Sequence, residues 1–112
     1  MILVILKIIS ALGTIATGVL ALIKPKSIFK FTGLKSTGQR GVTEIRTIFG
    51  GVFIALGASA LILNDYTHLG FMYVLLSIVR LISMLLIDKS TSESSNIISF
   101  ISEVVLGIIL LI

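Results

Sequence analysis

Long apolar stretches, separated by short polar segments, make up most of this chain. The apolar stretches cover residues 2–23, 42–63, 68–87 and 96–112. A helix rises about 1.5 Å per residue, so about 20 residues span the roughly 30 Å of hydrocarbon in a bilayer. The pattern therefore predicts four helices that cross a membrane. The last two connecting segments are short, which favours an up-and-down bundle with antiparallel neighbours.

Polar and small residues gather on one side of each predicted helix. In the first stretch Ser10, Thr14 and Thr17 recur at helical spacing, and in the third Ser77 and Arg80 do so. In membranes such faces contact other helices, while large aliphatic residues face lipid. We therefore expect these faces to form the helix contacts.

The second stretch carries two neighbouring faces of this kind, and the spacing alone leaves open which of them packs. Each face begins with one charged residue and continues with small residues. The first face comprises Glu44, Thr47, Gly51, Ala55 and Ala58, and the second comprises Arg46, Gly50, Gly57 and Ala60.

The composition favours a membrane protein over a soluble domain. Hydrophobic residues make up 56% of the 112 residues, charged residues only 12%, and the mean hydropathy is +1.19. Soluble domains carry about 25% charged residues, and so short a chain cannot enclose this much apolar surface. We therefore expect one all-α transmembrane domain over residues 1–112. We expect residues 2–23 to remain as a helix, because no basic residue opens them as in a signal peptide.

Basic residues concentrate in the loops on one predicted side of the membrane. The segment between the first two stretches holds five of them and no acidic residue, whereas residues 64–67 hold none. Positive loops mark the cytoplasmic side, so we expect a multi-pass inner (plasma) membrane protein with both termini outside. The basic residues expected to meet lipid headgroups at the cytoplasmic interface are Lys24, Lys26, Lys30, Lys35 and Arg40.

The same basic segment also contains apolar residues. Pro25 ends the first helix, and Ile28, Phe29 and Phe31 alternate with lysines after it. This alternation predicts a short segment that lies in the interface, with its aromatic side chains toward the hydrocarbon.

Four charged residues inside the apolar stretches form the candidate site, namely Glu44, Arg46, Arg80 and Glu103. A charge at the centre of a transmembrane helix costs about 2.5–3.5 kcal/mol, so each requires a partner or a function. Arg80 and Glu103 have opposite charges and similar predicted depths. We therefore predict an ion pair between them, with Glu44 and Arg46 on the cytoplasmic side of the same cleft. The cluster is either structural, fixing helix register, or a polar cavity for a proton, ion, lipid headgroup or small anion.

Few residues of the chain are suited to catalysis or to metal binding. There is no cysteine and one histidine, His68, and no nucleophile stands beside a matching base. A net charge of +4, confined mainly to one loop, does not indicate nucleic acid. We expect no catalytic residue, metal or cofactor. The expected partners are the lipid bilayer and either a second copy of the chain or a membrane partner subunit.

The second stretch carries a resemblance to a known family. Residues 44–51, Glu-Ile-Arg-Thr-Ile-Phe-Gly-Gly, resemble the Glu-x-Arg-x-x-(Tyr/Phe)-Gly-Gly opening of the second helix in a bacterial family of small four-helix membrane proteins. That family is described only as a domain of unknown function and is allied to DoxX-like proteins. Pro25, Arg80 and Asp88 also match its layout. The resemblance implies a four-helix inner-membrane protein and no known activity.

These observations favour a non-catalytic four-helix membrane protein. It would act as an accessory or interaction subunit, or bind a small ligand in its charged cleft. The alternative is a small proton-coupled transporter that works as an oligomer around Glu44 or Glu103. A membrane enzyme that modifies a quinone or a lipid is the third possibility, and the lack of cysteine and the single histidine disfavour it.

Overall fold

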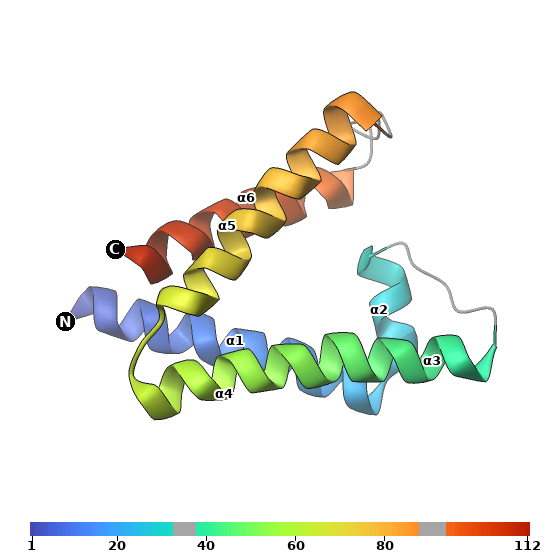
Figure 1. Cartoon of the computed structure of the whole chain (residues 1–112), viewed down its shortest axis with the longest axis horizontal. Coiled ribbons are helices and arrows are strands. Elements are labelled where there is room, and N and C mark those ends of the chain that lie inside the picture. Colours follow the sequence, from blue (N-terminus) through green and yellow to red (C-terminus); the bar gives the residue numbers. More distant parts are fainter. Residues whose placement is uncertain (33–37, 88–93) are drawn as a thin grey trace.

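Every regular element is a helix in the computed structural model, which describes residues 1–32, 38–87 and 94–112 (Figure 1). The elements are α1 (Ile2–Ile23), α2 (Pro25–Thr32), α3 (Gln39–Ile45), η1 (Arg46–Val52), α4 (Phe53–Leu63), α5 (Thr67–Ile82), η2 (Ser83–Ile87) and α6 (Ser94–Leu111). The segments η1 and η2 are π-helical. They continue their neighbours, so that α3, η1 and α4 form one long helix and α5 and η2 form another.

Three of the long helices are long and apolar enough to cross a membrane. They are Ile2–Ile23, Gln39–Leu63 and Thr67–Leu86. The fourth predicted stretch forms a shorter apolar helix, Asn96–Leu111. Counted over the residues that the structure describes, this helix is shorter than the other three. Within that part of the chain, three of the four predicted spans therefore have helices that are long and apolar enough to cross a membrane.

The long helices are arranged in two pairs. The α1 helix packs along η1 and α4, and α5 packs along α6, with fewer contacts between the pairs. Figure 1 shows the pairs meeting near the two termini and the α4–α5 turn, and diverging toward the opposite end. That opposite end carries the C-terminus of α1, α2 and the start of α3.

Glycines allow close approach within each pair. A Cβ on Gly57 would lie 2.5 Å from Cγ1 of Ile15 and 2.9 Å from the carbonyl oxygen of Ala11, so α1 and α4 leave no room for a side chain there. A Cβ on Gly107 would lie 2.8 Å from Cγ2 of Val74, at the contact of α6 with α5. Small residues thus form the helix contacts at these points, as their spacing predicts.

Hydroxyl groups on the inner faces of the described helices have hydrogen-bond partners within the protein. The hydroxyls of Ser10 and Ser77 donate to the carbonyl oxygens of Leu6 and Val74, at 2.8 and 2.7 Å. The Thr14 hydroxyl bonds to the Tyr73 hydroxyl, which links the two helix pairs. These residues therefore serve packing.

Large aliphatic side chains cover the outer faces of the long helices. Ile62, Val79 and Leu86, for example, are 81%, 61% and 74% exposed. Water penalises such exposure by about 25 cal/mol per Å² of apolar surface, whereas lipid does not. The outer surface is therefore typical of helices that contact lipid.

The predicted interfacial segment is helical. The α2 helix begins at Pro25, a position at which proline is tolerated because the first N–H of a helix needs no partner within the helix. It packs mainly against α1. The side chains of residues 28–31, and with them the alternation of aromatic residues and Lys30, lie outside what the structure describes, as do residues 33–37 with Lys35.

A tight turn joins α4 to α5. Asn64 ends α4 with φ 51° and ψ 40°, a left-handed conformation that asparagine tolerates better than most residues. The backbone N–H of Thr67 donates to Oδ1 of Asp65 at 3.1 Å and lowers the pKa of that carboxyl. The turn thereby reverses the chain within three residues, as antiparallel neighbours require.

Candidate functional site

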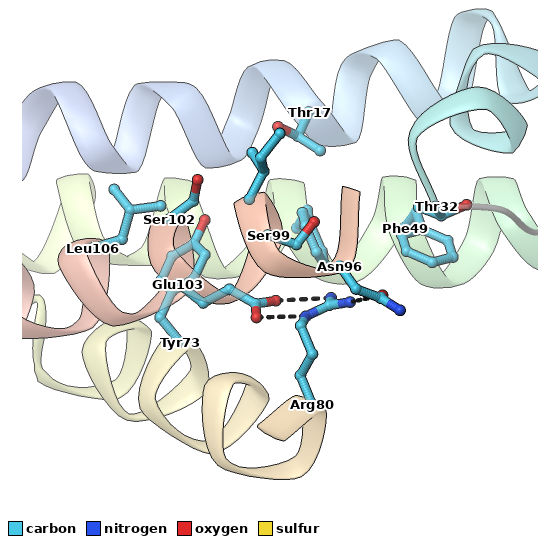
Figure 2. Close-up of a pocket in the computed structure, with 12 residues that line it drawn as sticks. Thr17, Thr32, Phe49, Tyr73, Arg80, Asn96, Ser99, Ser102, Glu103 and Leu106 are labelled. Carbon is cyan, nitrogen blue, oxygen red and sulfur yellow. Dashed lines mark hydrogen bonds and ion pairs between the residues drawn. The ribbon is translucent and has the colours of Figure 1, made fainter. Parts of the chain in front are cut away.

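A bidentate ion pair between Arg80 and Glu103 joins α5 to α6. Nε of Arg80 donates to Oε1 of Glu103 at 2.7 Å, and Nη2 donates to Oε2 at 3.0 Å (Figure 2). Two parallel N–H···O bonds between a guanidinium and a carboxylate are stronger and more specific in geometry than a single contact. The ion pair predicted from depth and sign is therefore confirmed.

A third contact extends the pair along α6. Nη1 of Arg80 donates to Oδ1 of Asn96 at 3.2 Å. Asn96 and Glu103 are seven residues apart, which places them on one face of a helix with Ser99 between them. Two residues on the polar face of α6, Asn96 and Glu103, thus bind the same arginine.

The two charged partners differ in exposure. The Glu103 side chain is 11% exposed and that of Arg80 is 31% exposed. Glu103 is therefore the more enclosed member of the pair. The Arg80 side chain stays partly accessible beside the pair.

A cavity of about 500 Å³ lies next to the ion pair, between the two helix pairs. This volume is within the range of roughly 300–1,000 Å³ that is typical of small-molecule sites. Its polar lining comes from α1, α2, α5 and α6, as Figure 2 shows. The polar residues are Thr17, Thr32, Tyr73, Arg80, Asn96, Ser99, Ser102 and Glu103.

The apolar part of the lining includes two phenylalanines from the second long helix. Phe49 lies in η1 and Phe53 directly follows it, with ring centroids 5.9 Å apart and ring planes tilted by 52°. Ile98 and Leu106 complete the apolar lining from α6. π-Helical segments are rare and occur often at functional sites. Sequence reasoning missed both phenylalanines, although their i, i+4 spacing on a polar-faced helix was a usable signal.

Glu44 and Arg46 do not join this site, which corrects the four-residue cluster. Both residues are exposed, and neither lines the cavity. Oε1 of Glu44 lies 4.0 Å from Nε of Arg40, one helical turn away, rather than near Arg80. The helix pairs diverge toward α3, and this separates Glu44 from α5 and α6 (Figure 1).

The remaining predicted residues lie apart from the cavity. Lys24, Lys26 and Arg40 are exposed at the end where the helix pairs diverge. At the other end Nζ of Lys7 lies 5.9 Å from the centre of the Tyr66 ring, a cation–π arrangement. Within the residues that the structure describes, no three His, Asp or Glu side chains come together as a metal site would require.

Among the residues that the structure describes, the charged groups of the cavity lining balance, so the site can bind polar groups without a net charge from them. One guanidinium and one carboxylate compensate each other, and hydroxyls and an amide surround them. Among the lining residues no hydroxyl stands beside a histidine or lysine that could activate it. The arrangement is suited to recognition by hydrogen bonds.

No family model matches the chain, and no significant match is found among curated proteins or among solved structures. The likeness of residues 44–51 to the small four-helix membrane family therefore stays a prediction.

Proposed function

We propose that this chain is an integral membrane protein of the inner membrane. It is a four-helix up-and-down bundle with both termini outside, and it binds a small amphipathic molecule without catalysing a reaction. The observation that carries the proposal is the ion pair of Arg80 and Glu103 at the wall of a cavity of about 500 Å³.

The membrane assignment rests on length and surface. Three helices are long and apolar enough to cross a bilayer, and large aliphatic residues cover their outer faces. The shorter α6 is compatible with this arrangement because it packs along α5 rather than standing alone. A bilayer thins, or flanking residues extend outward, to accommodate a short span.

The binding assignment rests on the cavity beside the pair. A buried ion pair is weak evidence for stability, because apolar side chains of similar volume often stabilise a protein equally well. A purely structural pair would also be expected to lie within packed side chains. Here Arg80 lines open space, and polar residues of four helices face that space with it.

The non-catalytic assignment follows from the groups that line the cavity. Its carboxylate, Glu103, is held at both oxygens by Arg80 and is therefore poorly placed to act as a general base. The hydroxyls of Ser99 and Ser102 lack an adjacent base among the lining residues. A binding or accessory role, alone or beside a membrane partner subunit, fits these groups better than turnover.

Ligand binding can be tested with purified protein in detergent. Extracts of membrane amphiphiles are added, and bound molecules are detected by native mass spectrometry. We expect Arg80→Leu to weaken retention of the bound molecule about tenfold, as the loss of a charged hydrogen bond would. Lys7→Leu is the matched control, because it removes a positive charge far from the cavity. If both variants retain amphiphiles as the parent does, the cavity is not a binding site.

The alternative, a small proton-coupled transporter, rests on the same buried carboxylate. Glu103 would have to release Arg80 in order to exchange a proton, because both its oxygens are engaged. Proteoliposomes with an imposed pH gradient test this alternative directly. If the pH gradient drives substrate uptake and Glu103→Gln abolishes it, the protein is a transporter and the proposed binding role is wrong.

A further inference from the structure

We infer that the molecule bound beside Arg80 and Glu103 is a phospholipid whose headgroup carries both a phosphate and a primary ammonium group, as in phosphatidylethanolamine. This inference rests on the proposed binding function and assigns the class of ligand. It follows from the charge of the cavity, from its unused hydrogen-bonding capacity and from its place in the molecule.

The first argument is charge. Arg80 and Glu103 together contribute no net charge to the cavity. A ligand with one net charge is attracted by one partner and repelled by the other, at nearly equal distance. A zwitterion can instead align against the pair, with its phosphate near the guanidinium and its ammonium near the carboxylate. Both ends are then attracted.

The second argument is hydrogen-bonding capacity. A guanidinium has five N–H donors, and three of those of Arg80 are used by Glu103 and Asn96. One N–H on each Nη therefore stays available. The Glu103 carboxylate has about four acceptor sites and accepts two bonds from Arg80. The pair can thus bind a phosphate and an ammonium without breaking its own two bonds.

This capacity also distinguishes between zwitterionic headgroups. A primary ammonium has N–H groups to donate to the free acceptor sites of Glu103, whereas the trimethylammonium of choline has none. Choline is instead recognised by several aromatic faces. In this cavity the aromatic rings of Phe49 and Phe53 both come from one helix, with their planes tilted by 52°. They belong to the apolar part of the lining, so they do not form the several aromatic faces that choline recognition requires.

The third argument is position. The cavity lies between helix pairs that diverge toward the end at which Lys24, Lys26 and Arg40 are exposed. Because the cavity lies between the diverging pairs, a lipid of the adjacent leaflet can direct its headgroup between them. Phe49 and Phe53 line the cavity from the second long helix, and their rings can contact the adjoining glycerol and acyl carbons.

The test is competition among lipids of identical acyl chains. Delipidated protein is mixed with equal amounts of phosphatidylethanolamine, phosphatidylcholine and phosphatidylglycerol, and the bound species are counted by native mass spectrometry. We expect at least about a tenfold preference for phosphatidylethanolamine, the ratio that one good charged hydrogen bond supplies. Soluble phosphoethanolamine is a separate arm, which distinguishes a lipid from a free headgroup.

Two variants and one control locate the preference. Glu103→Gln removes the carboxylate but keeps an acceptor for Arg80, so the protein should fold, while the preference over phosphatidylcholine falls toward equality. Arg80→Leu should reduce binding of all three phospholipids. Lys7→Leu should leave the preference of the parent unchanged.

The possible outcomes separate this inference from the proposed function. Equal binding of phosphatidylcholine, or stronger binding of phosphatidylglycerol, overturns the headgroup assignment but leaves an amphiphile site at Arg80. Equal affinity for soluble phosphoethanolamine overturns the lipid assignment. Binding that does not depend on Arg80 or Glu103 removes both the inference and the proposed function.

Discussion

At the scale of single residues, the side chain of Arg80 links α5 to α6. Its guanidinium bonds to both oxygens of Glu103 and to Asn96, and so connects two turns of α6 to one position on α5. Glu103 is more enclosed than Arg80. A stranded carboxylate is therefore less well solvated than a stranded guanidinium would be.

We expect Glu103→Gln to be less destabilising than Arg80→Leu. Glutamine still accepts a hydrogen bond from Arg80, whereas the loss of one side of a buried pair costs about 3–5 kcal/mol. Thermal unfolding of both variants in detergent at neutral pH measures this difference. If Arg80→Leu is as stable as the parent, the pair does not hold the helices together.

Asp65 gives a second prediction for a single residue. The Thr67 N–H lowers the pKa of Asp65 in the folded protein, so the charged form stabilises the turn. This contribution is present above the ordinary carboxyl pKa of about 3.9 and is lost as the pH falls through the depressed value.

Asp65→Ala should therefore lower the melting temperature at neutral pH. The difference from the parent should shrink steadily in acid, as Asp65 of the parent protonates. Asp65→Asn keeps an acceptor without the charge and should lie between the two at neutral pH. A difference between Asp65→Ala and the parent that persists unchanged in acid would show that the charge of Asp65 contributes nothing.

At the scale of elements, the choice of packed face on the second long helix is the main finding. Its two faces of small residues were equivalent by spacing. The structure buries Gly50, Gly57 and Ala60 against α1, and leaves Gly51 and Ala55 exposed. The π-helical η1 has more than 3.6 residues per turn, so it shifts the register between the residues before and after it.

Gly57→Ala and Gly51→Ala should therefore have opposite consequences. A Cβ at Gly57 would meet the Ala11 carbonyl oxygen at 2.9 Å, and such overpacking costs about 1–3 kcal/mol. A Cβ at Gly51 meets nothing within 4 Å, so alanine there should be neutral or stabilise the helix by up to about 1 kcal/mol. Thermal unfolding of both variants in one detergent decides the matter. If Gly51→Ala lowers the melting temperature as much as Gly57→Ala does, Gly51 lies in a contact with another chain.

At the scale of the whole molecule, the two helix pairs meet at one end and diverge at the other. This arrangement leaves both termini at the same end as the α4–α5 turn and separates them from Lys24, Lys26 and Arg40. The cavity exists because the pairs diverge. The distribution of basic residues along the chain supports the orientation that we propose for these two ends.

The orientation can be measured by cysteine labelling, because the chain has no cysteine of its own. Asn64 and Lys26 are exposed at opposite ends. We expect a membrane-impermeant maleimide to label Asn64→Cys in intact cells, and to label Lys26→Cys only after permeabilisation. Labelling of Lys26→Cys in intact cells would reverse the proposed topology.

The sequence alone determined the long helices and the central ion pair. Runs of apolar residues set the bounds of α1 and, within a few residues, those of the other long helices. A short connection makes the third and fourth stretches antiparallel neighbours. Arg80 and Glu103 have opposite charges and similar depths on their polar faces, so they were predicted to pair, and the structure pairs them.

Only the tertiary structure decided where the pairs diverge, which face of the second long helix packs and which side chains enclose the cavity. Periodicity gives each residue a face and a depth, but it assumes regular turns and contains no angle between helices. The structure selects the face with Gly50 and Gly57 for contact with α1, and close contacts at glycines bring the helices of each pair together. The tertiary structure also brings Phe49 and Phe53 to the cavity and leaves Glu44 and Arg46 outside its lining.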